Sequence, residues 1–90
     1  NVDGGFIKTK IPMKNIFDTS PVSRSQAKRV CNRLEKFKEI IIDFEGVQWM
    51  GQGFAHQLFA VFAREHPDIQ IVPVNMNEDI TKMYHHVITS

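Results

Sequence analysis

The residues with the clearest chemical potential form a turn, Gly51-Gln52-Gly53, between an apolar run and a helical pattern. Two glycines around one residue allow the backbone to turn its amides toward an anion at a helix N-terminus. However, the sequence lacks the Lys and Ser/Thr of a P-loop and the third glycine of a dinucleotide fingerprint. The turn therefore predicts a helix that starts close to a sheet, and a nucleotide or anion sensor at the turn is an alternative.

The other reactive side chains do not form a catalytic constellation. Asp43 ends an apolar run and has the chemistry of a general base or metal ligand, but no partner acid or positioned histidine accompanies it. His85 and His86 are neighbours on a predicted helix and point about 100° apart, so they do not grip one ion. Cys31 lies on an apolar helical stripe, which favours a core role. These patterns predict no enzyme, no metal site and no cofactor.

The first half of the chain predicts a strand, a helix and a second strand, which must position these groups. Residues 6–13 alternate as in a half-exposed strand, and the proline near its end places it at an edge or terminates it. Ser23 and Gln26 form a capping box, so a helix begins near Arg24. Residues 39–44 are an apolar run typical of a central parallel strand with both faces covered.

The second half predicts a helix, a strand and a last helix. Apolar residues spread around most of the helix that follows the glycine turn, so we expect it to pack on more than one side and to end at His66 and Pro67. Pro73 places the next strand toward a sheet edge. Asn77 then caps the last helix. The order predicts an α/β fold with a mixed, mostly parallel sheet and helices packed on it.

Length and motif order bound the domain organisation. Ninety residues suffice for one core, so we expect residues 6–90 to form a single domain, with a tail or linker at residues 1–5. Because the chain begins without Met, it reads as a piece of something longer. In open sheets of this kind, ligands and partners meet the loops at the C-terminal ends of the strands, which here are residues 43–53 and 75–77.

Composition limits the partners. Lysine and arginine total 11 against 10 aspartate and glutamate, so the chain is no general polycation. The single cysteine favours a reducing, cytoplasmic compartment, and the apolar runs are far shorter than the roughly 18 residues that span a membrane. The first predicted helix has a basic face, which carries Arg24, Lys28, Arg29 and Arg33. Such a face neutralises nucleic-acid phosphates, so a nucleic-acid contact module is a less favoured alternative function.

Three motifs together suggest a family. They are the Ser23-Arg24-Ser25 helix start, the strand end at 43–47 and the turn at 51–55, which reads Gly-Gln-Gly-Phe-Ala. With these motifs the chain resembles the bacterial and archaeal STAS-like family of unknown function, which is related to the STAS domains of anti-sigma-factor antagonists. The resemblance runs from Val22 to Met83. It implies a small STAS-like α/β fold.

The resemblance also implies a function. In the antagonists, a serine or threonine at the start of the helix after this turn is phosphorylated by a histidine-kinase-like ATPase. The matching region here, Gly51-Gln52-Gly53, lacks a phosphoacceptor. The chain is therefore expected to be a non-enzymatic interaction module in bacterial signalling or regulation, whose partner is such an ATPase or a domain of the same longer chain. Its expected partner-binding residues are Glu45, Gln48, Trp49, Gly51, Gln52, Gly53, His56 and Gln57.

Two features of this region leave alternatives open. Trp49 and Met50, just before the turn, are interpreted either as core residues or as an exposed anchor for a partner. An exposed apolar patch around Trp49 and Phe54 would equally serve a homodimer. The partner is thus a protein under the main hypothesis, with nucleic acid less favoured and no membrane expected.

Overall fold

The computed structural model describes residues 8–16 and 21–89, and these residues form an α/β fold. The tail expected at residues 1–5 lies outside this part of the chain. A parallel sheet has the strand order β1-β2-β3, with β1 at Lys8–Pro12, β2 at Glu39–Asp43 and β3 at Gln70–Val74. The α/β class, the central second strand and the two proline-containing edge strands are confirmed.

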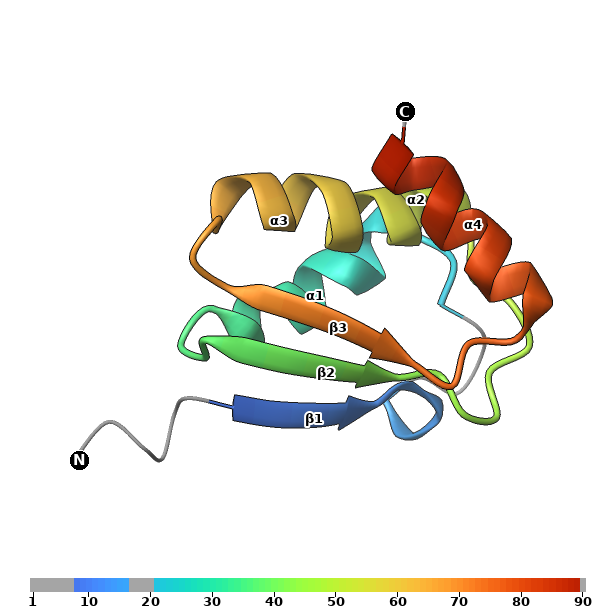
Figure 1. Ribbon diagram of the computed structural model, residues 1–90, viewed down its shortest axis with the longest axis horizontal. Coiled ribbons are helices and arrows are strands. Elements are labelled where there is room, and N and C mark those ends of the chain that lie inside the picture. The colour runs from blue at the N-terminus through green and yellow to red at the C-terminus, as the bar shows by residue number, and fades with distance from the viewer. Residues whose placement is uncertain (1–7, 17–20, 90) are drawn as a thin grey trace.

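Helices follow each strand (Figure 1). A short 3-10 turn, η2 (Met13–Asn15), follows β1, and α1 (Arg24–Leu34) leads to β2. One long helix, composed of α2 (Gln52–His56), the π-helical turn η3 (Gln57–Val61) and α3 (Phe62–Glu65), leads to β3, after which comes α4 (Glu78–Thr89). None of the described helices combines the length and apolar character needed to cross a bilayer.

The helix starts are set by local side-chain caps. The Gln26 N–H donates to Ser23 Oγ at 3.3 Å, and the Ser23 N–H donates to the Gln26 side-chain oxygen at 2.8 Å, which confirms the capping box of α1. At α4 the Ile80 N–H donates to Asn77 Oδ1 at 2.9 Å. Each cap satisfies amides that the first helical turn leaves without partners. Both helix starts are thus confirmed.

All described helices cover one face of the sheet, as Figure 1 shows. Ile40 and Ile42 point into this covered face and are fully buried, whereas Ile41 is only partly buried on the opposite face. The expectation that both faces of β2 are covered is therefore wrong. Because the strand order proceeds in one direction, two successive right-handed crossovers place their helices on the same side. The opposite face of the sheet is left without a helical layer among the described residues.

The long helix packs on several neighbours, as predicted. The Phe62 N–H donates to the Gln57 carbonyl, one residue beyond the α-helical partner, which defines the π turn. Within this turn, the centroid of the Phe59 ring lies 4.9 Å from that of the Tyr84 ring of α4, in a T-shaped contact. It lies 6.3 Å from the centroid of the Phe44 ring, which follows β2. The long helix therefore contacts both the segment after β2 and α4. It ends at Glu65, directly before His66 and Pro67, which were expected to stop it.

Candidate functional site

The loops after β2 and β3 meet at the C-terminal end of the sheet. Asn77 Nδ2 donates to the carbonyl of Gln48 at 2.7 Å and to that of Val47 at 3.3 Å, while its Oδ1 caps α4. One side chain thus holds the β2–α2 loop against the start of the last helix. Residues 43–53 and 75–77 were expected at the C-terminal ends of the strands, and the structure places them there in contact with each other.

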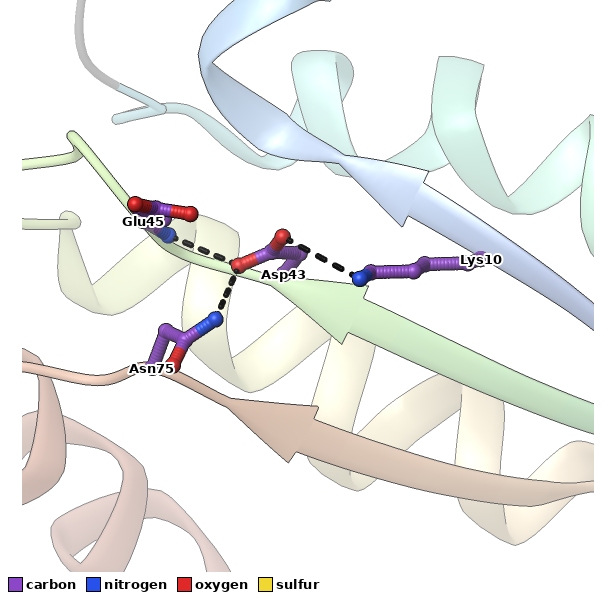
Figure 2. A network of polar contacts seen from close by, with 4 residues as sticks. All are labelled: Lys10, Asp43, Glu45 and Asn75. Carbon is purple, nitrogen blue, oxygen red and sulfur yellow. Dashed lines mark hydrogen bonds and ion pairs between the residues drawn. The ribbon is translucent and has the colours of Figure 1, made fainter.

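A second link at this end centres on Asp43, shown in Figure 2. Asp43 Oδ1 accepts hydrogen bonds from Asn75 Nδ2 at 2.9 Å and from the Glu45 N–H at 3.0 Å, and the Lys10 ammonium lies 3.7 Å from Oδ2. The hydrogen bond from Asn75, followed by that from Glu45, lowers the pKa of Asp43 despite its burial. A carboxylate held ionised in this way is a poor general base near neutral pH. Its role is to tie three strand ends together.

Asn75 holds this link at a cost in backbone conformation. Its φ is 56°, in the left-handed region that non-glycine residues rarely adopt. Asparagine tolerates this region better than most residues and here also supplies the amide that Asp43 accepts. An asparagine directly after a strand is the one local signal of this conformation.

Substitutions at Asn75 should separate the backbone from the hydrogen bond. Both Asn75→Ala and Asn75→Gly lose the hydrogen bond to Asp43, but only alanine is strained in the left-handed backbone region. We therefore expect Asn75→Ala to be less stable than Asn75→Gly by about 1 kcal/mol in urea unfolding. Equal stabilities of the two variants would mean that the backbone relaxes and stores no strain here.

The Gly-Gln-Gly turn packs against the segment that precedes α1. The Gly51 N–H donates to the Pro21 carbonyl at 2.8 Å, and the Phe54 N–H donates to the Val22 carbonyl at 3.2 Å. A Cβ at Gly51 would lie 2.5 Å from the Val22 oxygen, closer than real contacts allow. The predicted tight turn is thus present. Two amides that an anion would need already serve the protein, which counts against the sensor alternative.

Most of the predicted partner-binding side chains are exposed. We call the exposed members the loop surface, which consists of Glu45, Gln48, Trp49, Gln52 and His56. Gly53 is partly buried and Gly51 is buried, so both contribute backbone shape.

Two expectations of exposure in this region are wrong. Gln57 is only 8% exposed, and Phe54 is fully buried. The two residues are three apart on the helix, so they share its inward side, and the patch expected around Trp49 and Phe54 does not form. Of the pair before the turn, Met50 is core and Trp49 is exposed.

The sequence patterns missed two further apolar residues at this end. Large apolar side chains of the described residues are exposed at Ile16, Val22, Trp49 and Ile88. The first three lie at the C-terminal end of the sheet, after β1, before α1 and after β2, while Ile88 lies near the end of α4. Val22 flanks a turn and belongs to no periodic stripe, so only its contact with Gly51 places it here.

The remaining candidates lie elsewhere. The basic residues of α1 are exposed as predicted: Arg24, Lys28, Arg29 and Arg33. Cys31 is buried, and its pKa is raised to about 12 by burial and then by the charges of Glu35 and Glu65. It is therefore a core thiol at neutral pH. Within residues 8–16 and 21–89, no group of three or more His, Cys, Asp or Glu side chains is placed to hold a metal ion.

The comparisons with known proteins give one match. A family model described as a STAS-like domain of unknown function matches residues 26–81, which is more than half of the 90 residues. The matched stretch runs from the first turn of α1 into the first turn of α4 and contains Asp43, Asn75 and the glycine turn. No curated protein and no solved structure matches the chain.

Proposed function

The chain belongs to the family of STAS-like domains of unknown function, and on that premise we propose that it is a non-enzymatic docking module of bacterial cytoplasmic signalling or regulation. The module binds a protein partner through the loop surface. Exposed aromatic side chains are common anchors of protein interfaces, and Trp49 supplies one at the end of the sheet where partners of open α/β folds bind.

The observation that carries this proposal is the exposure of Trp49 on a loop that is otherwise anchored in the core. Its side chain is 46% exposed, whereas Val47 and Met50 on either side are 8% and 2% exposed and anchor the loop in the core. Asn77 adds two hydrogen bonds to the loop backbone. An anchor that is already ordered loses little entropy on binding, so such a loop favours affinity.

The state of the reactive groups supports a role without catalysis. The thiol of Cys31 is buried with a pKa of about 12, which leaves it protonated and unreactive at neutral pH. The carboxylate of Asp43 is occupied by hydrogen bonds and has a lowered pKa. Neither group is poised to transfer a proton or to attack a substrate.

The same turn bears on whether docking is regulated by phosphorylation. Gln52 stands in the region where the antagonists related to this family carry a phosphoacceptor, and its side chain cannot be phosphorylated. Docking is therefore not switched by phosphorylation of the turn. The proposed partner is a histidine-kinase-like ATPase or a domain fused to this one.

Affinity capture with matched variants tests the proposal. Wild-type protein, Trp49→Ala and Ile88→Ala are used to capture proteins from a lysate of the source organism, and the affinity of each captured protein is then measured. Ile88 is the control because it has the same exposed fraction, 46%, near the opposite end of α4. We expect Trp49→Ala to weaken the partner about thirtyfold, as at an interface hot spot, and Ile88→Ala to leave it unchanged. Equal binding by all three proteins would refute the loop surface.

A further inference from the structure

The two outer strands of the sheet differ in their capacity to accept another strand. The Gln70 N–H donates to the Lys38 carbonyl, and the Phe44 N–H donates to the Val74 carbonyl. Because backbone groups alternate between the two sides of a strand, the intervening Ile71 and Pro73 turn theirs toward the outer edge of β3. Pro73 has no N–H, so this edge cannot offer a regular ladder.

The outer edge of β1 is more complete. The register pairs Lys10 with Ile41, and the same alternation turns the N–H and C=O groups of Lys8 and Lys10 away from β2. The proline of this strand, Pro12, stands only at its last position. Figure 1 shows β1 at the border of the sheet, with no described strand beyond it. An extended segment can therefore pair with β1 without displacing any described strand.

A groove lies along the same strand on the helix-covered side. It has a volume of about 640 Å³ and runs between β1 and the C-terminal part of α1. Its apolar or small lining residues are Thr9, Ile11, Leu34 and Phe37. Its basic lining residues are Arg33 and Lys36. Glu35 is the one acid among its lining residues. A strand added to β1 would direct every second side chain into this groove.

Exposed basic side chains lie on both sides of this edge. Lys8 and Lys10 lie on the face opposite the groove, where their ammonium groups are 3.9 Å from Glu39 and 3.7 Å from Asp43. Their side chains are 58% and 61% exposed, so each can take a second carboxylate from its outer side. On the groove side, the lining residues Arg33 and Lys36 carry two positive charges against the single negative charge of Glu35.

We propose that the β1 edge, defined as Lys8–Pro12 with the adjoining groove, binds an extended acidic segment of a partner protein. The segment adds as a further strand, with alternate apolar side chains in the groove and the intervening acidic side chains beside Lys8 and Lys10. A second copy of this chain is a poor occupant, because two antiparallel β1 edges would set lysine against lysine. The site is separate from the loop surface, so either can fail without the other.

Synthetic peptides provide the test. The probe is an octapeptide of four Glu-Val repeats, and the control replaces each glutamate with lysine. In the free protein the amides of Lys8 and Lys10 should exchange rapidly with solvent, and the Glu-Val peptide should protect them. Two further peptides carry N-methyl groups on either all glutamates or all valines. Since only alternate amides face β1, one of these two should lose binding and the other should keep it.

Three variants complete the design. Lys10→Ala removes the charged side chain but keeps the outward N–H, Lys10→Pro removes both, and Trp49→Ala leaves the β1 edge intact. We expect Lys10→Pro to bind the Glu-Val peptide about tenfold more weakly than wild type, Lys10→Ala to bind with intermediate affinity, and Trp49→Ala to bind normally. If Lys10→Pro does not fold, the comparison of the two N-methylated peptides with wild-type protein still tests the proposal.

The proposal fails if the peptide leaves the two amides unprotected or if both N-methylated peptides bind equally. It also fails if a single-stranded oligonucleotide of equal charge binds more tightly than the peptide and Lys10→Pro does not alter that affinity. That result would assign the basic face of α1 to nucleic acid. Concentration-dependent dimerisation through β1 would instead assign the edge to a second copy.

Discussion

Replacing Gly51 with alanine should lower the free energy of unfolding by about 2–3 kcal/mol, because the new methyl group meets backbone atoms. Its Cβ would lie 2.5 Å from the Val22 oxygen and 3.0 Å from the Val22 Cα. The neighbour cannot simply move aside. The Val22 carbonyl accepts the Phe54 N–H, and the Pro21 carbonyl accepts the Gly51 N–H. Relief of the clash would therefore stretch both hydrogen bonds.

Gly53→Ala is the matched control for this prediction. A Cβ at Gly53 would lie 3.5 Å from the Arg24 nitrogen and 3.7 Å from the Val22 oxygen, which are ordinary contacts. Gly53 is within α2, where alanine is favoured over glycine by about 0.5–1 kcal/mol. Urea unfolding followed by far-ultraviolet circular dichroism should thus show opposite shifts for the two variants. Similar losses at both positions would mean that the turn needs glycine for conformation and not for close approach.

The distinct roles of the two glycines show where sequence reasoning reaches its limit. The Gly-Gln-Gly motif predicts a tight turn, because its glycines are local signals. Which glycine is indispensable depends on the carbonyls of Pro21 and Val22, which precede a helix elsewhere in the sequence. Such contacts carry no local pattern. The turn was predictable, and its tightest contact was not.

In the fold, too, features set by neighbouring residues were predictable, and features set by distant segments were not. The capping box at Ser23, the cap at Asn77 and the edge positions of the proline-containing strands depend on neighbouring residues, and all are confirmed. The one-sided sheet was missed because the apolar run of β2 is the same whether one face or two are covered. Only the strand order, together with crossover handedness, decides between these arrangements. The partly buried Ile41 is the consequence.

At the site, exposure was harder to predict than location. Both loops were expected at the C-terminal ends of the strands, where the structure places them, but the left-handed Asn75 that joins them through Asp43 had no sequence signal beyond its place after a strand. Gln57 was misplaced because its polar side chain suggested the surface, whereas the spacing from Phe54 puts it on the buried side of the helix. Helical position therefore outweighs residue polarity at this point.

Phe54→Ala is expected to lower the free energy of unfolding by about 3–5 kcal/mol, the largest effect among the predicted substitutions. The Phe54 ring is fully buried in the core at the start of the long helix. Its truncation removes apolar contacts and leaves a cavity that the neighbouring helices and the sheet cannot fill. A domain of 90 residues has a total stability of only about 5–13 kcal/mol, so Phe54→Leu, with an expected loss of about 1.5 kcal/mol, is the variant to measure if Phe54→Ala does not fold.

Trp49→Ala is the comparison that gives this result its meaning for function. Trp49 is larger than Phe54 but 46% exposed, so its removal should change stability by less than about 1 kcal/mol in the same experiment. Circular dichroism is needed because the chain has only this tryptophan. A large loss at Trp49 would make it a structural residue and remove the anchor from the loop surface. A small loss at Phe54 would instead restore the apolar patch, since an exposed phenylalanine contributes little to folding. The expected contrast assigns the two aromatic residues to different tasks, one to the core and one to a partner.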